Sequence, residues 1–263
     1  MKKVLVIGAH SFIGQKFKEY ITRKNIYDIK VDMVSASDGS WRLVNLENYD
    51  TVLHLSGIVH KKEKNNMELL YYEVNHKLAF EIARKSKDNQ VKQFIFMSSA
   101  AVYGKYYGCI TKDTVPNPNT YYGKSKLMAE RDILQLQDKD YKIAIVRPPM
   151  VYGKDCKGNY SKLEQLARFT LIFPEYHNKR SMLYIDTLLE NLIKLIQNEN
   201  SGYFFPQDEE YINTSAMVVK IRKNLGKETI LFHCLNGVIK FFVEKDFIVF
   251  RKMFGDFYYD KSL

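Results

Sequence analysis

Short apolar runs alternate with helical stripes of apolar residues along the first part of the chain. The apolar runs predict strands at 4–7, in "DIKVDMVSAS", at 52–55, in "VKQFIFMSS" and in "YKIAIVRPP". Apolar residues at helical spacing predict helices that begin near Phe12 and that cover 67–87, 121–137 and 185–197. Strands that alternate with helices predict an α/β fold with a doubly wound parallel sheet.

The pattern changes after Pro149, where stretches such as "GKDCKGNYSKL" and "FFPQDEEY" are rich in glycine, lysine and aromatic residues. We expect these stretches to be irregular, interrupted by one helix that returns to the sheet. The chain therefore divides into a sheet domain, residues 1–150 with 180–198, and a small carboxy-terminal lobe. The lobe comprises residues 151–179 and 199–263.

The stretch "VIGAHSFIG" stops the first strand at Gly8 and places a second glycine at Gly14. A strand, a tight turn and a helix in this order present unpaired N–H groups and a partial positive charge to a phosphate. The dinucleotide-binding fingerprint has a third glycine between these two, and Ser11 stands in its place. Taken alone, the turn fits a dinucleotide site and an ordinary strand-to-helix connection equally well.

The composition is that of a globular protein. The chain has 263 residues, of which 46% are hydrophobic and 27% charged, and it is long enough for one large α/β domain with or without an appendage. The formal net charge is +10, but the lysines are spread along the chain and form no basic stripe with interleaved aromatic residues. We therefore expect no nucleic-acid partner.

The sequence also predicts the cellular compartment and whether the protein binds a metal. The apolar run at 4–7 is too short for a signal peptide, and no apolar segment is long enough to span a bilayer. The three cysteines, Cys109, Cys156 and Cys234, are too widely spaced to indicate a disulfide framework or a zinc site. The histidines considered as metal ligands, His10, His54 and His60, have no carboxylate or cysteine at ligand spacing. We expect a cytoplasmic protein with no metal and no stable membrane insertion.

Three residues carry the candidate chemistry. Tyr122 and Lys126 stand four residues apart at the start of a predicted helix, so their side chains share one face. A lysine ammonium near a phenol favours the phenolate, and we expect Lys126 to lower the pKa of Tyr122 and make it a base near neutral pH. Ser99 follows the strand in "VKQFIFMSS", at the edge where open α/β sheets bind ligands.

The order of the glycine turn, "HLSG", "SSAAVYG", Tyr-x-x-x-Lys and "RPPMVYG" resembles the extended short-chain dehydrogenase/reductases. Within them it is similar to the NAD-dependent epimerase/dehydratase branch that includes UDP-glucose 4-epimerase. The resemblance covers nearly the whole chain and implies a Rossmann-type fold whose carboxy-terminal lobe binds substrate. It implies Ser99, Tyr122 and Lys126 as catalytic residues. Ser98 is the alternative to Ser99, which stands three residues before Val102 as in the family motif.

The resemblance also implies the ligands, namely NAD or NADP, with NAD favoured, and a UDP-sugar. The residues expected at the cofactor are Gly8, Ser11, Phe12, Ile13, Gly14, Ser35, Leu55, Ser56, Gly57, Asn75, Ser98, Tyr122, Lys126, Pro148 and Val151. Those expected at the substrate are Ser99, Tyr122, Asn159 in "KGNYSKL" and Arg180 in "RSMLYID", the last pairing with the diphosphate. The alternative for Arg180 is a surface arginine paired with Glu175.

The implied activity is epimerisation at C4 of a nucleotide-linked hexose by hydride transfer. The same residues serve a UDP-4-keto-sugar reductase of surface-polysaccharide biosynthesis, which is the alternative. The family's dehydratases carry an acidic pair near the serine motif, whereas this chain has Ala100 and Ala101. A non-catalytic dinucleotide-binding regulator is disfavoured because such members usually lose the tyrosine or the lysine.

The chain departs from the family pattern in two places. Between Gly14 and His54 one strand-helix unit is abbreviated to "DGSWRLVNLENY", and the acidic residue for the ribose is either Asp32 or Asp38. Family members usually continue past "FGDFYYD", so we expect either an incomplete last element of the lobe or a trimmed chain.

Assembly follows from the resemblance as well. The family's dimers form a four-helix bundle, so we expect the helices 67–87 and 121–137 to pair with those of a second copy. Tyr71 and Tyr72 add apolar area beyond the stripe that covers the sheet.

Overall fold

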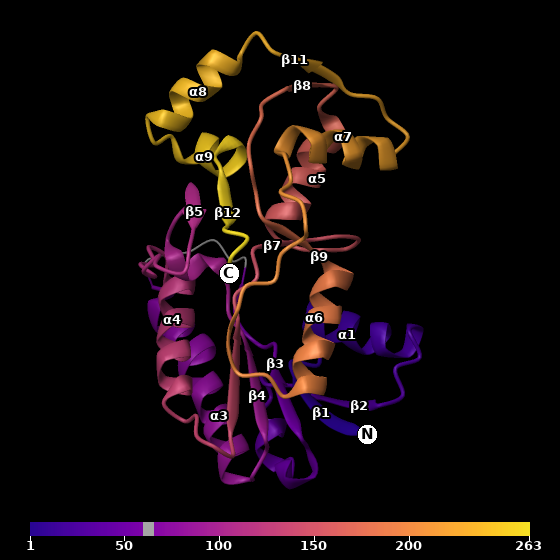
Figure 1. The fold of residues 1–263 in the computed structure, drawn as a ribbon, viewed down its shortest axis with the longest axis vertical. Helices are drawn as coiled ribbons and strands as arrows, with labels where there is room; N and C mark the ends of the chain where they lie inside the picture. The colour runs from indigo at the N-terminus through magenta and orange to yellow at the C-terminus, as the bar shows by residue number, and fades with distance from the viewer. Residues whose placement is uncertain (60–65) are drawn as a thin grey trace. The chain divides into compact units, whose positions relative to one another are not determined.

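The computed structural model describes residues 1–59 and 66–263, which form two compact units (Figure 1). The first unit comprises Met1–Gly104, Pro116–Pro148 and Ile185–Pro206. The second unit comprises Lys105–Val115, Pro149–Tyr184 and Gln207–Leu263. His60, one of the histidines considered above, lies outside the described residues.

The first unit is built on a six-stranded parallel sheet in the order β10-β6-β4-β3-β1-β2. Its strands are β1 (Lys2–Ile7), β2 (Ile29–Val34), β3 (Thr51–His54), β4 (Gln93–Met97), β6 (Lys142–Val146) and β10 (Gly202–Phe204). The predicted doubly wound α/β sheet is confirmed. The apolar runs marked every strand of the sheet except β10.

The strand order reverses between β1 and β3. Between β2 and β3 the chain forms two short 3-10 turns, Ser40–Leu43 and Leu46–Asn48, so the abbreviated unit predicted there is confirmed. In open α/β sheets, ligands bind beyond the carboxyl ends of the strands at such a reversal. The fold therefore directs attention to the loops that follow β1 and β3.

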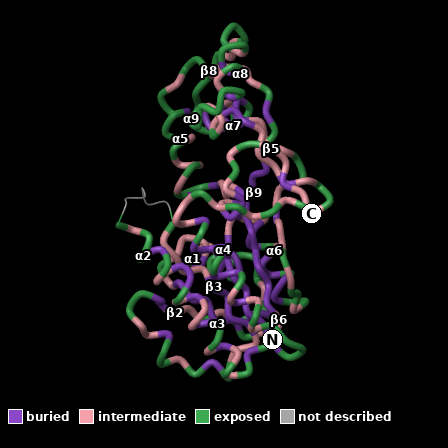
Figure 2. The backbone as a smooth tube through the Cα atoms, turned by 90° about the vertical axis from the view of Figure 1, so that its left-hand side faces the viewer, coloured by how far each residue is buried: buried purple, intermediate pink, exposed green. Residues whose placement is uncertain are grey.

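Helices cover both faces of this sheet. α3 (Leu78–Asp88) and α4 (Tyr121–Leu134) lie together on one face, and α1 (Phe12–Arg23) and α6 (Ile185–Asn198) lie together on the other (Figure 1). Figure 2 shows the sheet strands largely in the purple of buried residues. The core beneath α3 and α4 includes Leu5, Val52, Phe94, Phe96, Ile143 and Ile145 of the sheet with Ala79, Ile82, Ala129 and Ile133 of the helices.

A π-helical turn interrupts the helix expected over 67–87. The chain forms α2 (Glu68–Tyr71), the π-helical turn η3 (Tyr72–Lys77) and α3 in direct succession. A π turn contains one residue more than an α turn, and here both Asn75 and His76 are buried. Spacing by four residues predicts that Leu70, Val74, Leu78 and Ile82 form the inward stripe of this helix. The stripe is wrong at its start, because Tyr71 is buried and Leu70 is 43% exposed.

The second unit joins short parallel strands to helices. Its strand pairs are β5 (Gly108–Ile110) with β12 (Phe257–Tyr259), β7 (Met150–Tyr152) with β9 (Met182–Tyr184), and β8 (Ile172–Pro174) with β11 (Ile230–Phe232). Its helices are α5 (Asn159–Phe169), α7 (Thr214–Asn224), α8 (Asn236–Glu244) and α9 (Ile248–Phe254). The expectation of irregular structure here is wrong, because Ala167, Met217, Ile221, Ile239 and Phe254 from these helices form a shared core.

Four segments lie in a different unit from the one expected, and the shortest of them, residues 149–150, leads into β7 of the second unit. Residues 105–115 belong to the second unit because β5 pairs with β12, and residues 180–184 belong there because β9 pairs with β7. Residues 199–206 belong to the first unit because β10 extends its sheet beside β6. Of the helices in the described ranges, none has the length and apolar character needed to cross a membrane.

Candidate functional site

The turn between β1 and α1 lies at the carboxyl edge of the sheet. Gly8 has φ +125°, and a Cβ at this position would lie 3.2 Å from the backbone nitrogen of Ser56, in the loop after β3. A Cβ at Gly14 would lie 2.7 Å from Ser11 Oγ and 2.9 Å from the carbonyl oxygen of Gly8. Both glycines are therefore required for the close approach of the two loops and of the helix start.

Ser11 replaces the middle glycine without strain. Its φ is −73°, which any residue adopts, and its Oγ accepts the N–H of Gly14 at 3.1 Å as the N-cap of α1. Phe12 and Ile13 follow as the first residues of the helix, where backbone N–H groups have no acceptor within the helix. The turn keeps the helix start that an anion requires.

Asn75 fixes the loop after β3. Its Oδ1 accepts the N–H of Ile58 at 2.7 Å, and its Nδ2 donates to the carbonyl of Ile58 at 3.0 Å and to Ser125 Oγ at 3.3 Å. A Cβ at Gly57 would lie 2.9 Å from Asn75 Oδ1. The extra residue of the π turn therefore brings a buried amide onto the backbone next to residues 55–57.

Ser99, Tyr122 and Lys126 come together within the first unit. Ser99 follows β4 and donates a hydrogen bond to the hydroxyl of Tyr122 in the first turn of α4. Lys126 lies one turn later on α4, and its Nζ donates to the carbonyl of Met97 at 2.9 Å. Thr120 caps the helix by accepting the N–H of Gly123 at 3.0 Å, which fixes the start of α4 beside the end of β4.

The electrostatics of this cluster differ from the expectation. Burial raises the pKa of Tyr122 to about 12, although the hydrogen bond from Ser99 acts in the opposite direction. Burial lowers the pKa of Lys126 to about 8, and the nearby Glu130 carboxylate opposes this shift. The prediction that Lys126 lowers the pKa of Tyr122 is wrong, because loss of water outweighs other influences and the ammonium is directed to Met97. Tyr122 is a phenol at neutral pH.

A buried ion pair, missed in the sequence, lies behind the cluster. Arg147 donates from Nε to Glu130 Oε1 at 3.0 Å and from Nη2 to Glu130 Oε2 at 2.5 Å. Its Nη1 donates to the hydroxyl of Tyr103 at 2.9 Å, and Ser98 Oγ donates to Glu130. Two positions in the sequence could have revealed the pair: Arg147 directly follows a buried strand, and Glu130 lies within the helix that carries Lys126. Ser98 is thus engaged away from Tyr122, unlike Ser99.

The end of β2 carries the two candidate acidic residues. Asp32 lies within the strand and accepts a hydrogen bond from the Tyr49 hydroxyl at 3.1 Å. Asp38 follows the strand, and its hydrogen bonds from Ser40 lower its pKa. Ser35 is buried directly after β2. Asp38 is therefore an ionised carboxylate in the loop where the ribose-binding residue is expected.

The remaining predicted residues belong partly to the first unit and partly to the second. Pro148 follows β6 in the first unit, and its carbonyl accepts the N–H of Ala100 at 3.0 Å. Val151 lies in β7 of the second unit. Asn159, expected in a loop, is instead the exposed first residue of α5, because the helix begins directly after Gly158.

Arg180 lies in the second unit with a largely desolvated guanidinium. Its Nη1 donates to the carbonyl of Gly255 at 2.8 Å. Burial lowers its pKa to about 10, with Asp256 opposing the shift. Glu175, the carboxylate considered as a partner, contacts His233 at 2.9 Å instead, and the carboxylate whose charge acts on Arg180 is Asp256.

The parallel sheet, the glycine turn and the Ser99–Tyr122–Lys126 cluster together define a Rossmann-type protein of the short-chain dehydrogenase/reductase class. The chain belongs to the NAD dependent epimerase/dehydratase family, whose model matches residues 4–203.

Known proteins resemble most of the chain. It is 30% identical over 254 residues to the UDP-glucose 4-epimerase of Vibrio cholerae, a match that covers 87% of this chain and 77% of the relative. It is 26% identical over 249 residues to the N-acetyl-alpha-D-glucosaminyl-diphospho-ditrans,octacis-undecaprenol 4-epimerase of Escherichia coli O157:H7, covering 88% and 74%. The solved structure of a dTDP-4-dehydrorhamnose reductase from Clostridium acetobutylicum shares the fold, with a TM-score of 0.72, 20% identity and coverage of 88% and 83%.

Proposed function

We propose that this protein is an NAD(P)-dependent 4-epimerase that acts on a UDP-linked hexose. The observation that carries the proposal is the hydrogen bond from Ser99 to the hydroxyl of Tyr122, with Lys126 one helical turn away at the carboxyl edge of the sheet. The similarity to the Vibrio cholerae UDP-glucose 4-epimerase, which extends over most of both chains, supports a UDP-hexose as the substrate class.

The residues at the carboxyl edge fit a dinucleotide. The first turn of α1 would receive the pyrophosphate, because Gly8 and Gly14 leave no side chain in the way and the helix start attracts anions. Asp38 would accept hydrogen bonds from the adenosine ribose, which favours NAD over NADP because a 2′-phosphate would be repelled. When bound there, NAD(P) would supply reversible hydride transfer at C4 of the sugar.

The chain's own residues would move the proton. Tyr122, in its deprotonated form, takes the proton of the 4-hydroxyl as the hydride leaves C4, and it returns the proton when the 4-keto sugar is reduced again. Ser99 donates a hydrogen bond that stabilises developing charge on either oxygen. Lys126, whose Nζ donates to the carbonyl of Met97 at the end of β4, would hold the nicotinamide ribose.

Substrate binding would also involve the second unit. Arg180 offers a guanidinium suited to bidentate pairing with the diphosphate, and its depressed pKa reflects a charge that lacks full solvation. Asn159 at the start of α5 and Val151 in β7 complete the proposed set, for substrate and cofactor respectively. In this proposal the second unit is the substrate-binding lobe.

One observation favours the 4-keto-sugar reductase as a second candidate. Tyr122 is a phenol at neutral pH, and a phenol donates the proton that a carbonyl needs when it is reduced. A reductase would use the same three residues and consume one NAD(P)H for each sugar. Stoichiometric oxidation of NAD(P)H with a UDP-4-keto-hexose separates it from an epimerase, which shows no net oxidation.

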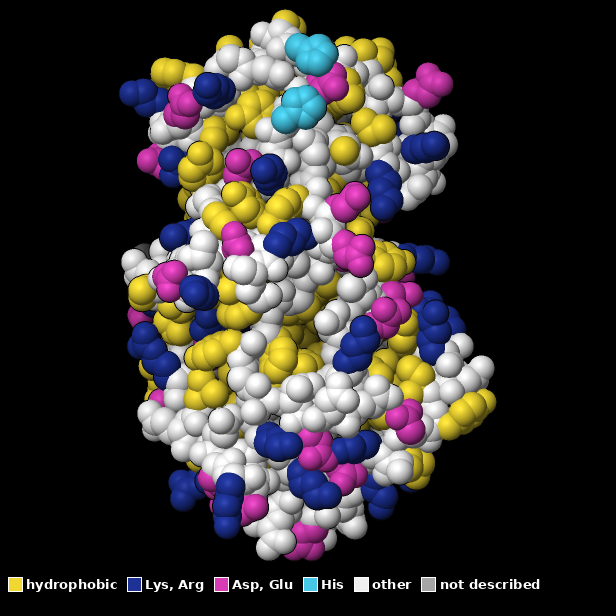
Figure 3. Space-filling model, viewed as in Figure 1, with side chains coloured by type: hydrophobic (Ala, Val, Ile, Leu, Met, Phe, Trp, Pro, Cys, Tyr) yellow, Lys and Arg dark blue, Asp and Glu magenta, His cyan; other side chains and the backbone are white. Residues whose placement is uncertain are grey.

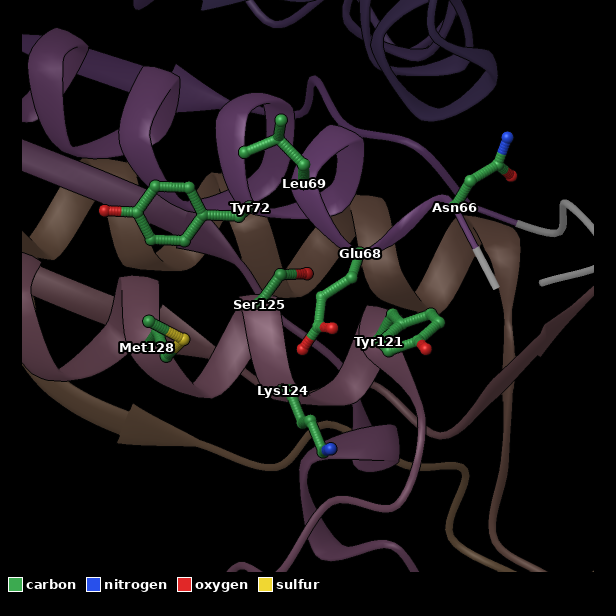
Figure 4. A pocket seen from close by; sticks show the side chains of 8 residues that line it. All are labelled: Asn66, Glu68, Leu69, Tyr72, Tyr121, Lys124, Ser125 and Met128. Carbon is green, nitrogen blue, oxygen red and sulfur yellow. The ribbon is translucent and has the colours of Figure 1, made fainter. Parts of the chain in front are cut away.

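We also propose that the enzyme is a cytoplasmic homodimer. A hollow of about 490 Å³ lies between α2, η3 and α4; its lining combines Leu69, Tyr72 and Met128 with polar and charged side chains such as Glu68 and Lys124 (Figure 4). Leu69 is 69% exposed, whereas Tyr71, expected to add exposed area, is buried against the core. Helices of a second copy would cover this face. The cysteines are free thiols, which supports a reducing compartment.

The test of the reaction is Tyr122→Phe, assayed by interconversion of UDP-glucose and UDP-galactose. Loss of one hydroxyl should reduce turnover by about 10²–10⁴-fold while folding and NAD(P) binding stay nearly unchanged. The matched control is Tyr121→Phe, which alters the neighbouring tyrosine in the hollow and should leave turnover unchanged. Wild-type turnover in Tyr122→Phe would remove Tyr122 from the proposed chemistry.

A further inference from the structure

The second unit exposes a set of apolar side chains on α8 and α9. We call this set the α8–α9 surface; it comprises Leu235, Val238, Phe241, Phe247, Ile248 and Val249. Their exposed fractions range from 46% for Leu235 to 65% for Val249. Figure 3 shows apolar side chains mixed with basic and acidic ones over these two helices, at the upper left. So much exposed apolar area in one place indicates an interaction site.

Aromatic contacts link the two helices that carry the surface, and core residues hold both helices from beneath. Leu235, Val238 and Phe241 repeat every three residues, so they share one face at the start of and along α8, while Ile239 and Val243 are buried in the core of the unit. The Phe242 ring joins the two helices, since its centroid lies 5.6 Å from that of Phe241 and 4.8 Å from that of Phe247.

Basic groups border the apolar side chains. Residues 235–254 contain four lysines and arginines against two acidic residues. Both acids are engaged, Glu244 with Lys240 at 3.9 Å and Asp246 with Arg251. Lys245 and Lys252 instead lie against aromatic rings, at 6.0 Å from the Phe241 centroid and 4.4 Å from the Tyr106 centroid. Within the described chain neither lysine has a carboxylate partner, so each can meet an external anion.

We propose that the α8–α9 surface attaches the protein to an anionic phospholipid bilayer, with the phenylalanines at the acyl boundary and Lys245 and Lys252 among the headgroups. Exposed phenylalanine and aliphatic side chains next to lysines are the combination that binds the membrane interface without spanning it. A second copy fits this surface less well, because self-association would bring two equally basic surfaces together. The proposal goes beyond the epimerase function and does not depend on it.

The experiment is flotation of the purified protein with vesicles of phosphatidylcholine alone or with 30% phosphatidylglycerol, the latter fraction chosen to be about that of an anionic membrane. We expect binding to the anionic vesicles and at least several-fold less to the neutral ones. The double variant Phe241→Ser with Ile248→Ser should bind about ten-fold more weakly, since two large apolar side chains no longer enter the interface. Lys245→Gln and Lys252→Gln should each weaken anionic binding about five-fold.

The matched control is Phe169→Ser with Leu171→Ser, which removes two exposed apolar side chains from another part of the second unit. The control should bind vesicles like the wild type. Val249→Ser provides a milder variant of the surface, and near-ultraviolet circular dichroism checks that each variant is folded.

Equal binding by the surface variants and the control, or no binding to anionic vesicles, would overturn the proposal. So would a dimer in solution that only the surface variants dissociate. Epimerase assays on soluble UDP-hexose should be unaffected, so the two proposals fail separately.

Discussion

The guanidinium of Arg180 is poorly solvated. It has one carbonyl acceptor from Gly255 at 2.8 Å, so a diphosphate would supply the countercharge that burial withholds. We expect Arg180→Ala to weaken UDP binding about ten- to hundred-fold, in line with loss of a hydrogen bond to a charged group. Turnover at saturation should change little, because such a contact binds ground state and transition state alike.

Calorimetry with UDP measures this effect, and Arg168→Ala, an exposed arginine on α5, is the control. NAD(P) affinity should stay the same in both variants. Unchanged UDP affinity in Arg180→Ala would assign the arginine to the structure of the second unit alone.

His54 is fully buried at the end of β3, and burial lowers its pKa to about 3. The unfolded chain binds a proton at this histidine near pH 6.5, whereas the folded chain does not until about pH 3. The folded state therefore loses stability as the pH falls from about 6.5 towards 3. His54→Leu should remove this loss, a difference of about 2–3 kcal/mol between pH 7 and pH 4.5.

Urea unfolding at the two pH values measures the change, with the exposed His177→Leu as the control. An identical loss of stability on acidification in wild type and His54→Leu would show that groups other than His54 cause the destabilisation at low pH.

At the scale of elements, the start of α1 depends on Ser11. Its hydroxyl accepts the N–H of Gly14, so Ser11→Ala should lower the free energy of unfolding by about 1 kcal/mol. Ser11→Gly, which restores the third glycine of the fingerprint, should cost only a few tenths of a kcal/mol. Thermal and urea unfolding compare the two variants directly. Equal stability of Ser11→Ala and wild type would mean that the cap contributes nothing to α1.

The elements also show how far sequence reasoning reaches. Long apolar runs identified the strands that lead to the candidate site, because a parallel strand buried on both faces must be apolar throughout. β10 was missed because it has three residues and a half-buried pattern. The helices α5, α7, α8 and α9 were missed because each has only 7 to 11 residues and lies among stretches rich in glycine, lysine and aromatic residues, which predicted irregular structure.

The candidate site was likewise predictable from the sequence only in part. Tyr122 and Lys126 share a helix face and Ser99 follows a strand, so local spacing was enough to expect them together. The pair Glu130–Arg147 joins a helix to a strand end, and the fall in the pKa of Lys126 depends on burial. Neither can be obtained from spacing, because both depend on the packed sheet.

At the scale of the whole molecule, the prediction concerns assembly. Leu69, Tyr72 and Met128 form an exposed apolar face beside the hollow between α2, η3 and α4. Burying this face in a dimer gains roughly 25 cal/mol for each Å² removed from water, and a glutamate at Leu69 would oppose it. We expect a dimer at micromolar concentration by light scattering and a monomer for Leu69→Glu. Leu43→Glu, at a 90% exposed site elsewhere in the first unit, should remain dimeric. A monomeric wild type would contradict the prediction.

The π turn has a consequence for the tolerance of this helix to changes in length. Because η3 holds one residue more than a regular helical turn, a deletion of one residue within Tyr72–Lys77 can leave an uninterrupted α-helix. Such a deletion would rotate everything before it by about 100° relative to α3. The same deletion would turn Leu69 and Tyr72 away from their outward positions and would break the hydrogen bonds between Asn75 and the backbone of Ile58. The extra residue thus couples the outer face of the helix to the loop after β3, and we expect natural relatives that lack it to differ at both places.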